Sequence, residues 1–271
     1  MLYLLLALFG GLSGVTTVLF GFGGGFVVVP LLYRVLSAAY GVHSPVGESA
    51  MHIAVATSTC VMVVNALAAT RRHARAGNIV WPAIRPLAGF IGLGAVLGAA
   101  AATMASASFI RWAFVVYLGI TIVDCLLRRG FMSRQEATSP QPLGPTQTVG
   151  GGLVIGLVAT FLGVGGSVMT VPLLRRRGFS MTRATAMANP LSLPVAIIGT
   201  ATYMAMAWVH PVALGPWHAG YVDLLAFAVL AAGSLLGIRL ASRYIGGIPD
   251  RVHAWVYVGL LVAVMLSMLV Q

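Results

Sequence analysis

Apolar segments separated by short polar stretches dominate the hydropathy pattern of the chain. They cover residues 2–20, 24–39, 49–70, 82–104, 110–127, 148–163, 166–176, 184–207, 222–242 and 252–270. A helix needs about 20 residues to cross the hydrocarbon core of a bilayer, and most of these segments come close to that length. The pattern predicts an all-α, polytopic membrane protein with eight to ten hydrophobic segments.

Two glycine clusters break this pattern at matching places. We call residues 21–25 the first knot and residues 163–167 the second knot; they align without a gap, and the match runs on through Pro30 and Pro172. Unwound backbone at membrane depth is costly unless it is buried in protein or lines a cavity. Broken segments at corresponding places in two halves point to the centre of a transporter. The segments around each knot form either two spans or a re-entrant hairpin, and we favour the hairpin.

The knots belong to a longer internal repeat. Gly94 and Gly98 align with Gly233 and Gly237, and this spacing lets helices approach closely. The proline-containing polar stretch 128–148 has the composition of a linker. An odd number of crossings in each half inverts the second half relative to the first. We therefore predict an inverted-topology repeat, with the first repeat at 1–130, a cytoplasmic linker at 131–147 and the second repeat at 148–271.

Composition and charge agree with a membrane protein. The chain is 59% hydrophobic and 8% charged, with a mean hydropathy of +0.97, whereas a soluble domain has about 25% charged residues. The net charge of +11 comes from arginines between apolar segments, so we expect no nucleic-acid partner. With the N-terminus outside, only Arg34 and Arg111 lie outside the cytoplasmic loops and their flanks. We predict a multi-pass protein of the cell inner (plasma) membrane with both termini extracytoplasmic; residues 1–20 lack the basic region of a cleavable signal peptide.

Ionisable residues within membrane segments are functional by default, and few occur here. Glu48 lies at the outer edge of segment 49–70, with His52 one helical turn deeper. Both are candidates for proton coupling, although we favour a structural pair at the interface. Asp124 precedes Arg128 by four residues, which indicates a topological pair. Because no carboxylate lies at a segment centre and we expect no buried arginine, we predict an anion site of neutral donors and helix dipoles.

Other classes of function find little support in the residue pattern. An intramembrane enzyme needs a nucleophile with a base, or two carboxylates, inside the segments, so we predict that the protein is not an enzyme. Cys60 and Cys125 read as buried small hydrophobes. His210 and His218 would need further ligands to hold a metal. We therefore expect no metal and no cofactor.

The candidate substrate site combines the knots with polar positions in two other segments. Free N–H groups and the macrodipole make helix N-termini favourable for anions, and a helix is expected to begin just after each knot. Close helix packing alone could also explain the glycines, and the hydroxyls could bond only within their own helix. The candidate substrate-binding residues are Gly23, Gly24, Gly25, Thr57, Ser58, Gly165, Gly166, Ser167, Asn189 and Pro190.

These duplicated patterns resemble those of a known family. Val29-Pro30-Leu31-Leu32 and Val171-Pro172-Leu173-Leu174 after the knots, with Ala56-Thr57-Ser58 and Gly77-Asn78, resemble the TauE/SafE sulfite exporter family (the TSUP or DUF81 permeases). The resemblance covers nearly the whole chain outside the linker. The second half departs from the pattern, because Asn189-Pro190 replaces a second Ala-Thr-Ser-like element, and this leaves the substrate open.

The resemblance implies a secondary transporter, a permease or exporter. Its substrates would be small sulfur-containing anions such as sulfite, thiosulfate or organosulfonates, bound near the midplane between the knots. The alternative is a passive anion channel on the same scaffold. The expected partners are the anionic substrate and the lipid bilayer, and a homo-oligomer stays open.

Overall fold

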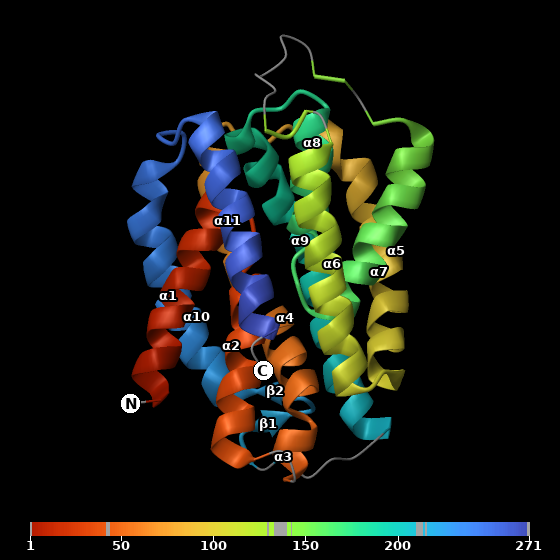
Figure 1. The fold of residues 1–271 in the computed structure, drawn as a ribbon, viewed down its shortest axis with the longest axis vertical. Helices are drawn as coiled ribbons and strands as arrows, with labels where there is room; N and C mark the ends of the chain where they lie inside the picture. The colour runs from red at the N-terminus through yellow and green to blue at the C-terminus, as the bar shows by residue number, and fades with distance from the viewer. Residues whose placement is uncertain are drawn as a thin grey trace.

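The fold is a bundle of long helices, seen in a computed structural model (Figure 1). The structure describes residues 2–41, 44–128, 130–132, 140–141, 143–209, 214 and 216–269. Its first half contains α1 (Leu2–Phe20), α2 (Gly25–Tyr40), α3 (Pro45–Glu48), α4 (Ala50–Arg75), α5 (Trp81–Met104) and α6 (Ala107–Leu127). The second half contains η1 (Gln147–Gly151), α7 (Gly152–Leu162), α8 (Ser167–Arg176), α9 (Met181–Val209), β1 (His218–Ala219), β2 (Val222–Asp223), α10 (Leu224–Ala241), η2 (Ser242–Tyr244) and α11 (Asp250–Leu269).

Every apolar segment of the sequence forms a helix. Within the described residues, seven helices are long and apolar enough to cross a membrane, namely α1, α4, α5, α6, α9, α10 and α11. The prediction of an all-α polytopic membrane protein is therefore confirmed. The helices stay intact because their backbone groups bond within the segment, as a bilayer requires.

The molecule has two ends, which we name by what lies there. The linker end holds the loop between α6 and α7, at the top of Figure 1, and the opposite end holds the start of α1 and the finish of α11. Arg129 and Arg134 lie outside the described residues, as do residues 133–139 and 142 of the predicted linker. At the opposite end, Arg34 donates from Nη2 to the carbonyl oxygen of Ser267 and Arg111 donates from Nε to that of Met268, so both cations cap the final turn of α11.

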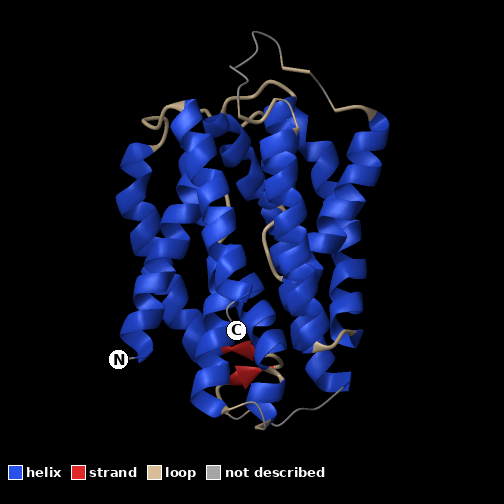
Figure 2. Ribbon diagram, in the orientation of Figure 1, coloured by secondary structure: helices blue, strands red, loops and turns tan. Residues whose placement is uncertain are grey.

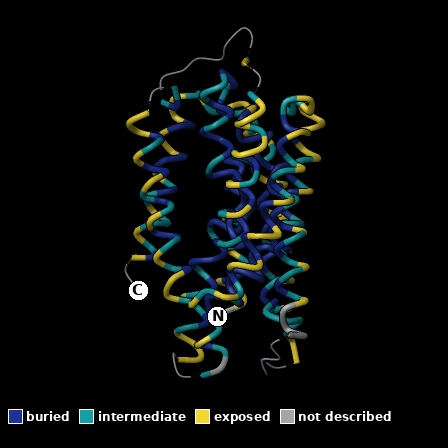
Figure 3. The backbone as a smooth tube through the Cα atoms, turned by 90° about the vertical axis from the view of Figure 1, so that its right-hand side faces the viewer, coloured by how far each residue is buried: buried dark blue, intermediate teal, exposed yellow. Residues whose placement is uncertain are grey.

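α4 and α9 form the centre of the bundle. In each of these helices 67% of the apolar window is buried, against 33–44% for the other five long helices. They pack against each other, and the exposed residues lie mainly on the outer helices (Figure 3). Residues on α4 and α9 are therefore shielded from lipid, which is where polar side chains can be kept in a membrane protein.

Glycine lets two pairs of parallel helices make close contact. A Cβ at Gly10 or Gly14 of α1 would collide with the carbonyl of Leu230 or Ser234 of α10. On the other side of the bundle, a Cβ at Gly156 of α7 would collide with the carbonyl oxygen of Ile91 in α5. The reciprocal glycines, Gly233 and Gly237 of α10 and Gly94 and Gly98 of α5, face backbone carbonyls of α1 and α7 in the same way.

The two helix pairs that flank the knots enter the bundle from different ends. α1 and α2 both reach the opposite end, while α7 and α8 both reach the linker end (Figure 1). The loops that join each pair lie inside the bundle (Figure 2). α1 is long enough to cross a membrane, yet α2 returns to the end from which α1 came. Each pair thus has the shape of a hairpin with its turn in the interior.

A short β-hairpin was not predicted from the sequence. β1 and β2 pair antiparallel, with Ala219 opposite Val222, at the opposite end of the molecule (Figure 2). Asp223 then caps α10, since its Oδ1 accepts from the N–H groups of Leu225 and Ala226 at 3.0 and 2.9 Å. The hairpin therefore fixes where α10 begins.

Candidate functional site

The first knot adopts backbone that favours glycine. Gly21, Gly23 and Gly24 have φ angles of +76°, +68° and +101°, values that cost an L-residue with a Cβ about 1–2 kcal/mol. In the second knot only Gly163 is left-handed, with φ +67°, whereas Gly166 is helical at −58°. The two knots are alike in sequence but differ in backbone geometry.

The two knots touch. A Cβ at Gly25 would collide with the carbonyl oxygen of Gly163, and one at Gly165 would come within 3.1 Å of the carbonyl oxygen of Phe22. The contact also involves Met62 of α4 and Ser192 of α9, whose side chains lie beside Gly23 and Gly165. Sequence reasoning missed Met62, which belongs to no duplicated element, whereas Ser192 is a polar residue of a membrane segment and could be considered from the sequence.

Carbonyl groups of the knots have hydrogen-bond donors. The Ser58 hydroxyl donates to the carbonyl oxygen of Gly163 at 2.8 Å, and the Ser13 hydroxyl donates to that of Gly24 at 3.2 Å. Asn65 supports Ser13 through its Nδ2 at 3.2 Å and accepts at Oδ1 from Ser234 of α10. Side chains from α1, α4 and α10 thus hold the knot backbone in place.

The N–H groups beyond the knots lack such partners. α2 starts after Gly24 and α8 after Gly166, and neither N-cap residue caps its helix with a side chain. Within the described part of the chain, no hydrogen bond uses the backbone N–H of four buried residues at these helix starts: Gly25, Phe26, Ser167 and Val168. An unpaired buried N–H is rare and costs about 1–3 kcal/mol. Two helix N-termini with free donors therefore lie on either side of the contact between the knots.

The other predicted site residues differ in what they bond to, and only some of them bond outside their own segment. Thr57 is bonded to the start of the β2–α10 segment, because its Oγ1 accepts from the N–H of Asp223 at 3.0 Å. Asn189 donates from Nδ2 to its own helix at Thr185, 3.2 Å away, and its buried Oδ1 has no partner in the part of the chain that the structure describes. Pro190 lies in the interior of α9 and leaves one carbonyl of that helix without its usual donor. Ser167 has its hydroxyl 3.5 Å from the carbonyl oxygen of Gly165, at the limit of a hydrogen bond.

An aromatic column connects the first knot with α11. The ring of Phe22 stacks on those of Phe26 and Tyr257, with centroids 4.3 and 4.7 Å apart. The Tyr257 hydroxyl donates to the carbonyl oxygens of Ser167 and Val168 at 3.3 and 3.5 Å. The second of these carbonyls has no N–H to accept, because Pro172 stands four residues later. One residue of α11 therefore contacts both knots, a role that nothing in its own sequence context indicated.

The expected pairing of Glu48 with His52 is wrong. α3 ends at Glu48 and α4 starts at Ala50, and Ser49 between them has φ −91° and ψ 1°, so the two side chains do not share a continuous helix. Within the described residues no ion pair includes Glu48. The ring of His52 instead lies 5.5 Å from that of Tyr221.

The expectation of no buried arginine is also wrong. Arg175 is 2% exposed, and its Nη1 lies 2.6 Å from Oδ2 of Asp250. Its other bonds go to the carbonyl oxygens of Phe131 and Phe179 at 3.2 and 3.1 Å. The guanidinium is thus bonded to groups at the linker end of the fold, and it does not contribute to the knots.

Asp124 has two partners. Its pairing with Arg128, at 3.7 Å, is confirmed, but a tighter ion pair and hydrogen bond join it to Arg176 of α8. This bond ties α6 of the first half to α8 of the second. His210, the other half of the disfavoured metal pair with His218, lies outside the described residues.

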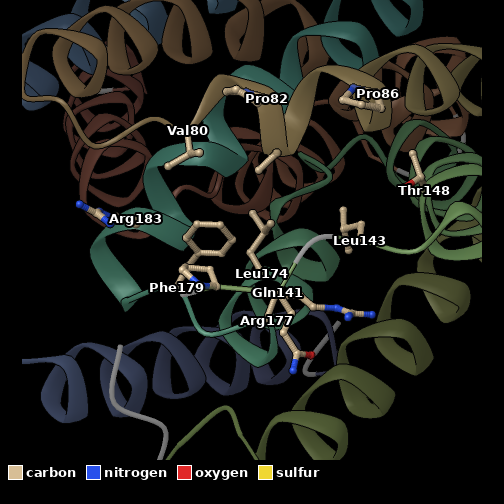
Figure 4. A pocket seen from close by; sticks show the side chains of 12 residues that line it. Val80, Pro82, Pro86, Gln141, Leu143, Thr148, Leu174, Arg177, Phe179 and Arg183 are labelled. Carbon is tan, nitrogen blue, oxygen red and sulfur yellow. The ribbon is translucent and has the colours of Figure 1, made fainter. Parts of the chain in front are cut away.

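A pocket of about 400 Å³ opens at the linker end (Figure 4). It lies between the start of α5, the end of α8 and the described linker residues. Leu174 and Phe179 supply apolar lining, and Arg177 and Arg183 supply positive charge. The pocket does not include the knots, whose residues 21–25 and 163–167 are all buried. The region between the two helix N-termini is therefore closed to solvent in this conformation.

Comparison with known proteins agrees with this architecture. Residues 6–268 match the family described as Sulfite exporter TauE/SafE. A probable membrane transporter protein of Haemophilus influenzae is 29% identical over 91% of this chain and 90% of its own length. Another, from Methanocaldococcus jannaschii, is 24% identical over 88% and 86%, and one from Xylella fastidiosa is 30% identical over 61% and 59%. No solved structure gives a significant match.

The family match spans the same helices that build the bundle, from α1 to the last turn of α11. It includes both knots and both close-packed helix pairs, so it does not rest on one local motif. Multi-pass architecture and relatives named as membrane transporters agree with each other. The chain therefore belongs to the TauE/SafE sulfite exporter family of membrane transporters.

Proposed function

We propose that the protein is a secondary transporter of small sulfur-containing anions, such as sulfite, thiosulfate or organosulfonates, which bind between the two knots. The observation that carries the proposal is the set of four buried N–H groups, at the starts of α2 and α8, that have no hydrogen-bond partner among the described residues. An anion between two helix N-termini would accept these hydrogen bonds and interact favourably with both dipoles.

The chemistry of the knots suits a small oxyanion. Such an anion presents several acceptor oxygens over a few ångströms, and backbone N–H groups can approach it closely only where no side chain intervenes. The carbonyl oxygens of Gly24 and Gly163 accept from serine hydroxyls, which reduces their repulsion of a negative charge. Neutral donors bind an anion less tightly than an arginine fork would, which allows release on the other side.

Alternating access requires two states that differ in which end of the molecule is open. The reciprocal glycine contacts of α1 with α10 and of α7 with α5 support the predicted inverted repeat, because equivalent pairs form on both sides of the knots. Since the knots are buried from both ends, we assign the present conformation to an occluded state.

Charge supports an orientation for the transporter. Described arginines are concentrated on segments that reach the linker end, while Arg34 and Arg111 lie at the opposite end. By the positive-inside rule the linker end faces the cytoplasm of the cell. Arg177 and Arg183 would then give the pocket at that end a positive field for anions arriving from the cytoplasm.

The test is anion flux in proteoliposomes made with the purified protein. The panel is radiolabelled sulfite, thiosulfate, sulfoacetate and phosphate. We expect saturable uptake of at least one sulfur anion and counterflow, in which internal unlabelled anion accelerates accumulation of external label. Flux that does not saturate and shows no counterflow would indicate the passive channel. Absence of flux for all three sulfur anions, with folded protein in the bilayer, would contradict the proposal.

A further inference from the structure

Two buried histidines hold the last turn of α1. Nε2 of His73, in the final turn of α4, lies 2.7 Å from the carbonyl oxygen of Val18. Nε2 of His253, in the first turn of α11, lies 2.8 Å from the carbonyl oxygen of Leu19. The side chains are 1% and 3% exposed. Two imidazoles from different helices thus bind consecutive carbonyls immediately before the first knot.

The hydrogen bonds decide which ring nitrogen is free. A carbonyl oxygen only accepts, so Nε2 must carry the proton in both rings and Nδ1 must hold a lone pair. Both Nδ1 atoms are buried, and neither has a hydrogen-bond partner among the described residues. A buried acceptor without a partner costs about 1–3 kcal/mol, and two in one place call for an explanation.

A small cavity adjoins the two rings. Both histidines line it, together with Thr182 at the start of α9, Tyr244 of η2 and the segment around Gly246. Its volume is about 10 Å³, which is near the lower limit for a single water molecule. Tyr244 and Gly246, which also line the cavity, are exposed, so a single water there would give a proton a route to the rings that does not pass the knots.

The charged groups around the pair are few. α1 contributes carbonyl oxygens, α9 contributes the hydroxyl of Thr182, and η2 contributes the phenol of Tyr244. α11 and α8 contribute the ion pair of Asp250 with Arg175, in which the two charges largely offset each other. Since two imidazolium ions in one buried place repel each other, the pair is suited to hold one proton and not two.

The pair is connected to the first knot by direct contacts. The ring of Phe20 lies edge-on to that of His253, with centroids 4.9 Å apart, and it stacks on Phe22 at 6.3 Å. The N–H of Gly21 bonds back to the carbonyl oxygen of Thr17 at 2.9 Å. A change in the position of either histidine would therefore move the residues that shape the first knot.

We propose that His73 and His253 form a proton-binding site that couples the movement of one proton to that of the anion. The proposal rests on the transport function proposed above, and it places proton coupling at residues other than Glu48 and His52, which were the candidates from the sequence. The added proton would sit on a free Nδ1. The resulting positive charge lies beside the first knot, so it would favour the state in which an anion is bound there.

The experiment compares exchange with driven uptake in proteoliposomes, using labelled thiosulfate and sulfoacetate, whose charges do not change near neutral pH. The variants are His73→Gln, His253→Gln and the double variant. A glutamine amide can still donate to the carbonyl but cannot take up a proton. His218→Gln serves as the matched control, and membrane potential is clamped. Melting curves in detergent check that each variant is folded.

In the wild type we expect each pH unit across the membrane to change the accumulation ratio by about tenfold per proton, with matching proton movement reported by a pH dye inside the vesicles. The glutamine variants should keep counterflow and lose this pH-driven accumulation, while His218→Gln keeps both. Accumulation that ignores the pH gradient in the wild type would overturn the inference even if no variant folds. The inference would also be overturned if His52→Gln lost the pH-driven accumulation while the variants of His73 and His253 kept it. Absence of wild-type counterflow would instead contradict the transport function itself.

Discussion

Gly163 and Gly166 lie three residues apart in the second knot, and they differ in backbone conformation and in the space available for a side chain. Gly163 has φ +67°, and a Cβ there would lie 2.6 Å from Cγ1 of Val55. Gly166 has a helical φ of −58°, and a Cβ there would meet only Cγ2 of Ile155, at 2.9 Å. Backbone strain and crowding therefore act together at the first position but not at the second.

This difference predicts the outcome of two alanine substitutions. Gly163→Ala should destabilise the protein by more than the 1–2 kcal/mol of left-handed backbone alone, because Val55 must also move. Gly166→Ala should cost less, since its helical backbone accepts a Cβ without strain and only one methyl group of Ile155 must give way. Thermal unfolding in detergent measures both. Equal melting temperatures for the two variants would show that the second knot is not held in the conformation described.

Arg175 gives a second prediction at the scale of a residue. Arg175→Gln removes the guanidinium that donates to Oδ2 of Asp250 and to two carbonyl oxygens, and loss of a bond to a charged group costs about 1.5–3 kcal/mol. We expect a melting temperature several degrees lower than in the wild type. Arg251→Gln, at an exposed neighbour of Asp250, is the control and should be neutral. A neutral result for Arg175→Gln would mean that the guanidinium is not buried in this network.

Among the elements, the parallel pairs α1–α10 and α5–α7 are the most closely packed, because glycines there allow backbones to touch. α5 offers an internal comparison. A Cβ at Gly94 would collide with the carbonyl oxygen of Leu153, whereas one at Gly89 meets nothing within 4 Å. The two glycines lie on one helix but only one is at the interface.

Alanine at these two positions should therefore have opposite effects. Gly94→Ala should destabilise the bundle by about 1–3 kcal/mol through overpacking. Gly89→Ala should be neutral or stabilising by up to about 1 kcal/mol, because alanine favours a helix. Size-exclusion profiles after heating give the order of stability. If Gly89→Ala were the less stable variant, the packing of α5 on α7 would be wrong.

The helices could be predicted from the sequence because each one coincides with a continuous run of apolar residues, and the length of such a run is a local property of the chain. α1, α5 and α8 begin and end within one residue of the predicted segments. Contacts between distant segments could not be predicted in that way. The burial of Arg175, the tie between Asp124 and Arg176, and the contact of Tyr257 with both knots each join residues far apart in the chain.

The candidate site was predictable only in part, for the same reason. The glycine pattern indicated the knots, because glycine is the residue that permits left-handed backbone and close approach. Thr57 carries a hydroxyl in the middle of a membrane segment, but its bond to Asp223 depends on a β-hairpin that has no counterpart in the first half. Met62 lies beside the knots without any signal of its own in the sequence.

For the whole molecule, orientation is the property that charge predicts. Single cysteines at Ser180, at the linker end, and at Ser106, at the opposite end, test it in a variant lacking Cys60 and Cys125. We expect an impermeant thiol reagent added to intact cells to label position 106 and not position 180. Ser133 and Gly215, which the sequence places on the same two sides, lie outside the described residues. The reverse labelling pattern would contradict the positive-inside assignment.

The central claim is that one anion binds between the two knots, and Ser167→Ala tests it with the least disturbance. The serine hydroxyl has only a marginal bond, to Gly165 at 3.5 Å, so its loss should leave the fold intact. If the hydroxyl donates to the anion, removing it costs about 0.5–1.5 kcal/mol, which corresponds to a roughly threefold to tenfold higher KM for sulfite counterflow. Ser267→Ala, whose hydroxyl bonds within α11, should keep the wild-type KM. An unchanged KM in Ser167→Ala, or an equal rise in Ser267→Ala, would contradict the proposed site.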